Sequence, residues 1–379
     1  MKILHVSNYY FPNIGGIEQV ARDCVHALGD SVEQRLFCFN REKGDVIETI
    51  DGIPVVRAGT FAKVASQSLS TSYGKLLKRQ FKEFVPDIVI FHFPNPFAAH
   101  FLLKQLKKYP DCRLIVWWHL DITKQKILGK FFHGQTLRLL RRAERIIATS
   151  PNYVEGSKYL PAFREKCIVI PNCAGAERIQ ADESAYALAD EIRADNGKKT
   201  ILFALGRHVP YKGIEYLVRA SKLLDDSFAV YIGGEGPLTD SLKSLAAGDE
   251  KVVFLGKVDE RTRKAYTLAC DIFCFPSVTK NEAFGIALAE AMAFGKAVIT
   301  FTIEGSGVNY VSLNGVTGIE VNNADVAAYA EAIKRLAGDD ALREKFAAAA
   351  KSRVEEYFTE EKFHQNVCEA VADVEAKRA

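Results

Sequence analysis

The 379-residue sequence lacks several features that would assign it to a protein class at once. Its longest apolar runs, such as LIVWW at 114–118, have the length of a strand and are far too short to span a bilayer. The N-terminus enters a strand-like run directly, without the long apolar stretch and cleavage site of a signal peptide. No C-x-x-C pair occurs among the eight cysteines. We therefore expect a cytoplasmic protein with reduced, mostly buried thiols.

Charge is distributed unevenly along the chain, although the net charge is only +3. Residues 1–170 contain 25 Lys and Arg against 15 Asp and Glu, whereas the remainder contains 25 against 32. A basic first half indicates an anionic partner, for which nucleic acid and a lipid surface are both candidates. One basic segment interspersed with apolar residues is either a membrane-binding surface or a solvated helix face; its cations are Lys124, Lys126, Lys130, Arg138, Arg141, Arg142 and Arg145.

Strand-like apolar runs alternate with helix-like amphipathic stretches along the whole chain. Several are continuous apolar runs, as expected for parallel strands that are covered on both faces. This alternation occurs twice, and the chain exceeds the usual size of one domain, so we predict two doubly wound α/β domains. The predicted strands lie at 3–7, 88–92, 114–118, 146–149 and 168–170, and then at 200–205, 228–232, 252–255, 272–275 and 297–301.

The boundary between the two predicted domains follows the strand at 168–170. A polar stretch separates this strand from the next one, so we expect an N-terminal domain at 1–172 and a linker at about 172–198. The C-terminal domain then covers 198–356. The last segment, 357–379, is predicted to form a long helix.

Ligands of open α/β sheets bind beyond the carboxyl ends of the strands, so the residues that follow strands are candidates. In the stretch GRHVPYKG at 206–213, Arg207 and Lys212 place two positive charges on one short loop at a helix start, which suits a diphosphate. The glycines of GGEGP at 233–237 allow a ligand to approach the backbone closely. The proline that follows them does not fit the glycine motif of dinucleotide-binding proteins. Each stretch alone could also be an ordinary solvated loop.

The stretch EAFGIALAE at 282–290 is the most informative. Residues from Gly285 onward predict a helix that ends at Gly295 and whose first amides can receive phosphate oxygens. Glu282 and Glu290 lie roughly 12 Å apart along such a helix, too far to share a metal ion or to form a paired-carboxylate hydrolase site. The spacing fits one extended ligand with phosphates between its two ends.

A divalent ion is not expected at this site. No two aspartates flank a single residue anywhere in the chain, although such a pair commonly holds a metal ion on a nucleotide diphosphate. Arg207, Lys212 and a helix N-terminus would then stabilise the negative charge instead.

The first half offers weaker candidates. Gly15 and Gly16 precede a predicted helix, outside any G-x-G-x-x-G pattern, and could equally form an ordinary strand–helix turn. His119 lies at the carboxyl end of a predicted strand, two residues before Asp121. It is either a site residue or a structural histidine at the edge of the core whose hydrogen bonds are satisfied. For His92 and Asn95 a structural role or contact with an acceptor is favoured over chemistry.

Taken in order, these motifs resemble those of bacterial glycosyltransferase family 4 (group 1), which has the GT-B fold, retains anomeric configuration and needs no metal. The resemblance rests on G-R-x4-K-G at 206–213, GGEGP at 233–237, E-x7-E at 282–290, the glycine pair and His119. It implies two Rossmann-like domains facing each other across a cleft. The N-terminal domain would bind the acceptor, the C-terminal one the nucleotide sugar, and the final helix would cross back to the first domain.

The same resemblance implies a role for each residue. His119, Arg207, Lys212 and Glu282 would form the catalytic set, with Arg207 and Lys212 on the donor diphosphate. Because no carboxylate is marked as a nucleophile, the implied mechanism is a front-face displacement in which the leaving diphosphate helps to deprotonate the acceptor. Glu290 would bind the ribose. The remaining donor contacts would come from Gly15, Gly16, Gly234, Lys257, Val258, Ala283, Phe284, Gly285 and Ile286.

A narrower likeness concerns the substrates. FHFPNPF, WWHLDITKQK and IATSPNY resemble segments of O-antigen and exopolysaccharide mannosyl- or rhamnosyltransferases. This implies GDP-mannose or a UDP-sugar as donor, and a glycan or polyprenyl-diphosphate-linked glycan as acceptor. We expect no separate cofactor, and no nucleic acid as partner because nucleic-acid binding would explain the basic first half but not the loops of the second. Peripheral contact with the inner face of the plasma membrane is expected only if the basic segment is a membrane-binding surface rather than a solvated helix face. Two alternatives stay open: a non-hydrolysing UDP-sugar epimerase, and an inactive protein that binds nucleotide sugars.

Overall fold

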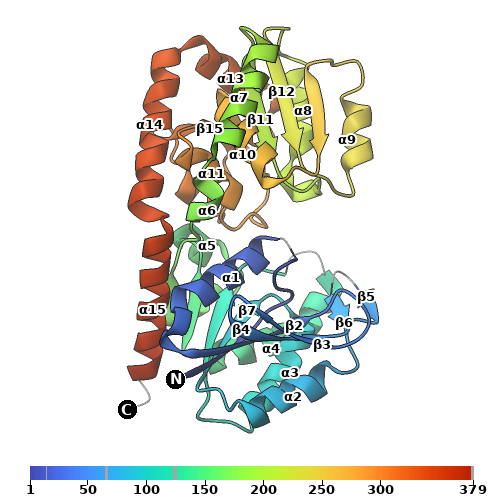
Figure 1. The fold of residues 1–379 in the computed structure, drawn as a ribbon, viewed down its shortest axis with the longest axis vertical. Helices are drawn as coiled ribbons and strands as arrows, with labels where there is room; N and C mark the ends of the chain where they lie inside the picture. Colours follow the sequence, from blue (N-terminus) through green and yellow to red (C-terminus); the bar gives the residue numbers. More distant parts are fainter. Residues whose placement is uncertain (14, 65–66, 123–125, 377–379) are drawn as a thin grey trace. The chain divides into compact units, whose positions relative to one another are not determined.

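The computed structural model describes residues 1–13, 15–64, 67–122 and 126–376, without the side chains of residues 64 and 126–131 (Figure 1). The chain divides into two compact units. Unit 1 comprises Met1–Ile170 and Glu361–Ala379, and unit 2 comprises Pro171–Glu360. Each unit contains one large sheet flanked by helices, as the two predicted α/β domains require.

Unit 1 is built on an eight-stranded sheet with the order β10-β9-β8-β7-β1-β2-β4-β3. Neighbouring strands run parallel except β3 and β4, which form an antiparallel hairpin. The strands are β1 (Lys2–Val6), β2 (Glu33–Phe39), β3 (Val46–Ile50), β4 (Ile53–Ala58), β7 (Ile88–Phe93), β8 (Arg113–Trp118), β9 (Arg145–Ala148) and β10 (Cys167–Val169); β5 (Ala62–Val64) and β6 (Gln67–Leu69) form a separate pair.

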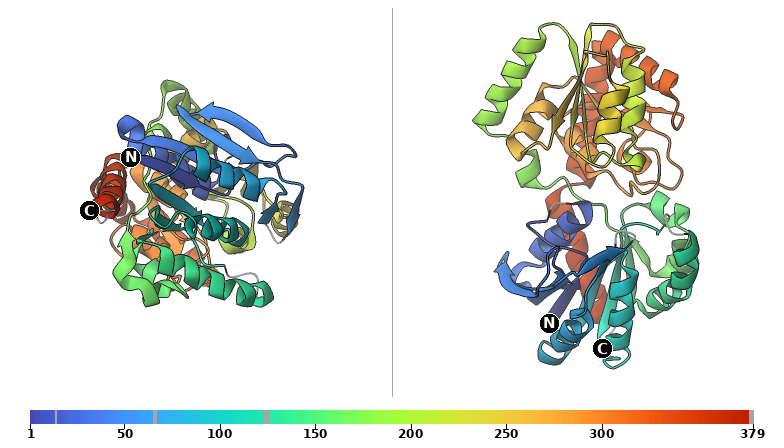
Figure 2. Two further views of the ribbon diagram at one scale, coloured as in Figure 1. Left: turned by 90° about the horizontal axis from the view of Figure 1, so that it is seen from below. Right: turned by 90° about the vertical axis from the view of Figure 1, so that its right-hand side faces the viewer.

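Helices cover both faces of this sheet (Figure 2). One face carries α2 (Tyr73–Glu83), α3 (Pro96–Leu106) and α4 (Lys126–Arg142), which pack on one another. On the other, α1 (Gly16–Leu28) meets α15 (Glu360–Ala376) where Cys368 Sγ lies 3.3 Å from the carbonyl oxygen of Ala27. The remaining elements of unit 1 are η1 (Gly29–Ser31), α5 (Pro151–Gly156) and η2 (Leu160–Lys166).

The sequence patterns missed β2, β3 and β4 because polar residues interrupt their apolar runs. In β2, Gln34 is buried, and its side-chain amide donates to the carbonyl oxygens of Val25 and Gly29 at 3.1 and 2.9 Å. These hydrogen bonds allow a polar side chain to be buried in the strand. The β3–β4 hairpin turns at Asp51 and Gly52, both with positive φ, and this Asp-Gly pair was a usable sequence indicator of a hairpin.

Unit 2 is built on a six-stranded parallel sheet with the order β13-β12-β11-β14-β15-β16. Its strands are β11 (Thr200–Leu205), β12 (Phe228–Gly233), β13 (Val252–Gly256), β14 (Ile272–Phe275), β15 (Ala297–Phe301) and β16 (Gly318–Val321). Its helices are α6 (Ala176–Ile179), α7 (Glu183–Asn196), η3 (Pro210–Lys212), α8 (Ile214–Ser221), α9 (Thr239–Leu245), α10 (Glu260–Ala269), α11 (Ile286–Ala293), α12 (Val308–Val311), α13 (Val326–Gly338) and α14 (Asp340–Tyr357).

The stretch expected to be a linker, at about 172–198, belongs instead to the body of unit 2. Helix α7 packs along α10 on one face of the sheet, while α8, α9 and α13 cover the other (Figure 2). Ala189 and Ile192 of α7 contribute to the hydrophobic core. The many charged residues of α7 lie on its exposed face, so the stretch looked more polar than a packed helix usually does.

Helices α14 and α15 are separated by a break at Phe358 and Thr359. The Phe358 ring is buried against Phe284 and Tyr310 of unit 2, at centroid distances of 5.4 and 5.9 Å. After the break, α15 packs on unit 1, where Phe363 is 2% exposed and contacts Trp117 at 5.7 Å. None of the helices in the described ranges combines the length and the apolar character that crossing a bilayer requires.

We predict that Phe363→Ala destabilises unit 1 by about 3–5 kcal/mol, because it leaves a cavity against Trp117. Both tryptophans of the chain, Trp117 and Trp118, lie in unit 1, so urea unfolding followed by tryptophan fluorescence reports on this unit. Glu361→Ala, at an exposed position of the same helix, is the matched control and should change the free energy of unfolding by less than about 0.5 kcal/mol. Equal effects of the two substitutions would contradict the packing role of α15.

Candidate functional site

Four neighbouring strands of unit 2 place the predicted donor-binding residues at one edge of the sheet. The loops that follow β11, β12, β13 and β14 start at Gly206, Gly234, Lys257 and Pro276, in an order set by the adjacency of these strands. Backbone hydrogen bonds join the loops: His208 N to Glu235 O at 3.1 Å, Gly234 N to Gly256 O at 2.7 Å, and Val278 N to Tyr211 O at 2.9 Å. The carboxyl edge is therefore one connected structure.

Two glycines allow the loops to approach this closely. A Cβ atom at Gly213 would lie 2.0 Å from the Pro276 carbonyl oxygen, and one at Gly234 would lie 2.1 Å from the Gly206 carbonyl oxygen. Both residues also have positive φ, at 60° and 115°. A side chain at either position would therefore force the loops apart.

Lys212 and Glu282 form an ion pair in which Nζ lies 2.5 Å from Oε2. The side chains are only 14% and 12% exposed. Ser277 Oγ donates to the same carboxylate at 3.1 Å, and the Lys212 ammonium lies 5.1 Å from the centre of the Phe275 ring. Burial alone would lower the pKa of Lys212, but Glu282 and Tyr211 outweigh it and raise the pKa, so this residue is cationic.

Positive charge at this edge extends beyond the ion pair. Arg207 is exposed, and within the described ranges it has no ion-pair partner. Helix α11 begins next to Glu282, and none of the described side chains caps its N-terminus. Gly285, the residue before the helix, has a φ of 95°. Arg207, Lys212 and the first amides of α11 are therefore positively charged groups at this edge, and such groups can bind an anion.

The other predicted residues of the 282–290 segment are placed as follows. Ala283 and Ile286 are partly buried on either side of Phe284 and Gly285, and Phe284 itself is 2% exposed and belongs to the hydrophobic core. Only the backbone of Phe284 is therefore suited to contact a ligand. Lys257 is exposed and Val258 is partly buried beyond β13.

Glu290 lies inside an ion-pair network that sequence patterns did not reveal. Its Oε1 accepts from Arg178 Nε at 2.8 Å and its Oε2 accepts from Arg263 Nη1 at 3.0 Å. Arg263 also bonds Glu260 and the carbonyl oxygen of Arg178, both at or below 2.7 Å. Burial raises the pKa of Glu290 although Arg263 and Arg178 oppose this effect. Arg178 lies in the supposed linker and Arg263 on a charged helix, so no local pattern marked either one.

In unit 1, the glycine pair and the histidine follow different strands, β1 and β8. Gly15 and Gly16 start α1, and a Cβ atom at Gly15 would lie 2.3 Å from Glu18 Oε2, so this carboxylate lies beside the start of the helix. His119 follows β8 and is 5% exposed. Its Nε2 lies 3.1 Å from Nδ1 of His92, on β7.

Asp121 and Asn95 have structural roles. Asp121 accepts hydrogen bonds from the Trp118 indole at 3.0 Å, the Ser157 hydroxyl at 2.7 Å and the backbone N–H of Lys158 at 2.8 Å. Asn95 caps α3 by accepting from the backbone N–H of Ala98 at 2.9 Å. Among the residues that the structure describes, no group of three or more His, Cys, Asp or Glu is arranged to hold a metal ion.

Comparison with known proteins identifies the family of this chain. The family described as "Glycosyltransferase Family 4" matches residues 14–178, and "Glycosyl transferases group 1" matches residues 188–353. D-rhamnosyltransferase WbpZ of Pseudomonas aeruginosa is 32% identical over 367 residues, which cover 95% of this chain and 92% of that protein. O-antigen chain mannosyltransferase C of Escherichia coli is 31% identical over 369 residues, which cover 95% of each.

The chain belongs to glycosyltransferase family 4, group 1. This is a retaining family, and the chain is a glycosyltransferase that uses a nucleotide sugar. The structure of HepE from Anabaena in complex with UDP matches with a TM-score of 0.79 and 19% identity, and the match covers 98% of this chain and 100% of that one. The fold is therefore GT-B, as predicted.

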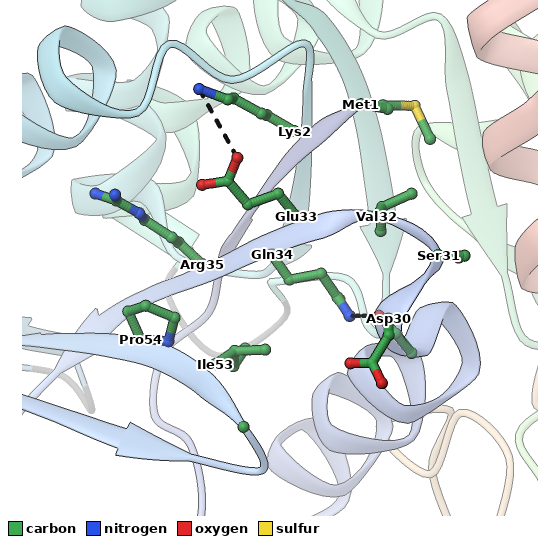
Figure 3. A pocket seen from close by; sticks show the side chains of 12 residues that line it. Met1, Lys2, Asp30, Ser31, Val32, Glu33, Gln34, Arg35, Ile53 and Pro54 are labelled. Atoms are coloured by element: carbon green, nitrogen blue, oxygen red, sulfur yellow. Dashed lines mark hydrogen bonds and ion pairs between the residues drawn. The ribbon is translucent and has the colours of Figure 1, made fainter.

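A hollow in unit 1 of the glycosyltransferase lies at the opposite, amino-terminal end of the parallel strands (Figure 3). Its lining comes from the starts of β1, β2 and β4. Two of the lining residues form an ion pair, in which Lys2 Nζ lies 3.8 Å from Glu33 Oε2. Ligands of α/β sheets bind at the carboxyl ends of the strands, so we assign no function to this hollow.

The basic segment of the glycosyltransferase is only partly described. Lys124 lies outside the described residues, as do the side chains of Lys126 and Lys130. In the described part of α4, Leu139 and Leu140 are fully buried, and Arg142 donates to backbone carbonyl oxygens of Pro110 and Cys112. Arg145 pairs with Asp373. Within the side chains of α4 that the structure describes, from residue 132 onward, Arg138 and Arg141 are the exposed cations.

We predict that Arg263→Met destabilises unit 2 by about 3–5 kcal/mol, because it leaves the buried Glu290 carboxylate with one cation fewer. Arg261→Met, two residues away on the exposed side of α10, is the control and should cost less than about 1 kcal/mol. Urea unfolding followed by far-UV circular dichroism measures both. If Arg263→Met lowers the free energy of unfolding no more than Arg261→Met does, the assigned ion-pair network is wrong.

Proposed function

We propose that this glycosyltransferase transfers a hexose, with retention and without a metal ion, from GDP-mannose or a UDP-sugar to a glycan. The acceptor is a free or polyprenyl-diphosphate-linked glycan in the synthesis of O-antigen or exopolysaccharide. The arrangement of Arg207, Lys212 and Glu282 at the start of α11 carries this proposal. The names of the rhamnosyl- and mannosyltransferase relatives support the sugar and pathway, and the HepE complex with UDP supports a nucleotide diphosphate.

The geometry suggests how the ion pair acts in catalysis. Lys212 and Arg207 would bind the diphosphate and stabilise the charge that develops on it as the bond to the anomeric carbon breaks. Glu282, held by Ser277, would then accept hydrogen bonds from hydroxyl groups of the sugar. The acceptor oxygen would bond to the anomeric carbon on the face that the diphosphate leaves, and its proton would pass to a diphosphate oxygen. The protein mainly supplies position and charge.

Other residues would bind the remaining parts of the donor. Glu290 would bind the ribose, and the chain at Lys257 and Val258 would flank the base, next to Gly234. Two carboxylate oxygens have lone pairs for about four hydrogen bonds in all, so Glu290 can hold ribose hydroxyls without releasing both arginines. In unit 1, Gly16 would direct an amide to the diphosphate and His119 would contact the donor sugar.

We expect Lys212→Met and Glu282→Gln each to lower kcat by at least about 100-fold, because each removes a charge that acts on the donor. Lys243→Met, at an exposed lysine of α9, is the charge-matched control and should retain its activity. Transfer is measured as release of nucleoside diphosphate in the presence of acceptor. Near-normal turnover in either site variant would make the site assignment wrong.

The donor is identified by thermal unfolding in the presence of nucleotides. A nucleotide that binds only the folded chain adds about 2.7 kcal/mol of stability at 100 times its Kd, so GDP or UDP should raise Tm by several degrees. We expect the larger shift with GDP and no change in the shift when EDTA is added. A shift that disappears with EDTA would contradict the metal-independent mechanism.

We also propose that α4 attaches the enzyme to anionic membranes through Arg138 and Arg141. Vesicles that contain phosphatidylglycerol should float the wild-type chain, whereas Arg138→Glu with Arg141→Glu should weaken flotation. Vesicles of phosphatidylcholine alone are the control. Failure of the wild-type chain to float with anionic vesicles would remove the membrane proposal and leave the transferase site untouched.

A further inference from the structure

Three histidines lie side by side on neighbouring strands of unit 1. His5 of β1, His92 of β7 and His119 after β8 have nearly parallel rings, with centroids 6.3 Å apart between the first two and 5.3 Å between the last two. Trp117 stacks on His92 at 5.6 Å. His5 and His92 are fully buried, whereas His119 is 5% exposed. Within the row, a ligand can therefore reach only His119.

The hydrogen-bond polarity at the inner end of the row follows from Gln34. Its side-chain N–H groups donate to the carbonyl oxygens of Val25 and Gly29, so its Oε1 faces His5. His5 Nε2 lies 2.9 Å from this oxygen and is therefore the protonated nitrogen of the ring. The Nδ1 of His5 is buried and, among the described atoms, has no partner.

The same reasoning assigns the proton of His92. Its Nδ1 lies 3.1 Å from His119 Nε2, and one of these two nitrogens donates to the other. The Nε2 of His92 is buried with no partner among the described atoms. A proton on that nitrogen would be a buried N–H without an acceptor, which proteins avoid more strictly than an unused acceptor. His92 therefore carries its proton on Nδ1 and donates it to His119.

Both rings are neutral under ordinary conditions. Burial lowers the pKa of His119 to about 3, and burial together with the neighbouring His119 and His5 lowers the pKa of His92 well below its usual value. The two rings therefore do not titrate near neutral pH, and each has one N–H and one acceptor nitrogen.

We propose that His92 is a positioning residue that sets the tautomer of His119. Because Nε2 of His119 accepts from His92, the proton of His119 lies on Nδ1, and His119 presents an N–H donor to its ligand. The group it recognises is a hydrogen-bond acceptor, such as a sugar hydroxyl oxygen or a phosphate oxygen, rather than a hydroxyl proton. The identity of the ligand as a donor sugar rests on the proposed function, whereas the tautomer does not.

The tautomer can be measured directly in the full-length chain labelled with [15N]histidine. Long-range 1H–15N spectra distinguish Nδ1–H from Nε2–H rings, and single substitutions assign the signals of His92 and His119 among the eight histidines. We expect both rings as neutral Nδ1–H tautomers, unchanged between pH 6 and 8. A wild-type His119 with its proton on Nε2 would overturn the proposal.

Substitutions then test whether His92 is the cause. Asparagine can keep a donor near the place of Nδ1, so His92→Asn should preserve the Nδ1–H form of His119. The carboxylate of His92→Asp can only accept a hydrogen bond, so this variant should place a proton on Nε2 of His119. His92→Leu should lower kcat/KM for the donor by about tenfold, because it removes the hydrogen bond that orients the His119 ring, and His92→Asn should recover most of this loss.

His5→Leu is the matched control, because it removes a buried ring of the same row that makes no bond to His119. It should leave His119 as the Nδ1–H tautomer. An unprotonated Nε2 of His119 in His92→Asp would overturn the positioning role. If the tautomers are as proposed but no nucleotide sugar supports transfer, the proposed function fails and this inference stands.

Discussion

The ion pair between Lys212 and Glu282 is the interaction on which the proposed chemistry depends. It joins two loops that follow neighbouring strands, β11 and β14, and it is mostly buried against Phe275 and Ser277. Glu282 helps to raise the pKa of Lys212 against the effect of burial, so this lysine stays cationic. A ligand that carries both phosphates and hydroxyl groups can replace each partner with a matching group, so the pair keeps the site ordered before the ligand arrives.

Backbone hydrogen bonds between the loops hold the two residues of this ion pair in place, in addition to their side-chain contacts. The loops at 206–213, 234–237 and 276–285 are hydrogen-bonded to one another, and glycines at 213 and 234 allow their close contact. These constraints also fix where α11 begins. The helix N-terminus and the two cations therefore reach the same edge of one rigid sheet, which is the preorganisation that charge stabilisation requires.

Buried polar groups away from the ion pair have different consequences. The Arg178–Glu290–Arg263 network joins a segment near the start of unit 2 to α10 and α11, so the proposed ribose ligand is oriented by residues distant in sequence. In unit 1, the histidine row keeps two rings fully buried and only one within reach of a ligand. Asp121, in contrast, uses its carboxylate oxygens to hold β8 to the segment at 157–158.

The sequence by itself determined the α/β class, ten strands of the two main sheets and the family, because apolar runs and loop motifs are local features. The start of α11 and the loop with Arg207 and Lys212 were predictable for the same reason. Tertiary structure alone decided which groups meet. Arg178 and Glu290 are 112 residues apart, and His92 and His119 are 27 apart, yet both pairs are in hydrogen-bond contact. Strand order and helix packing bring such residues together, and no local periodicity encodes that order, so ion-pair partners and histidine tautomers become visible only in the folded chain.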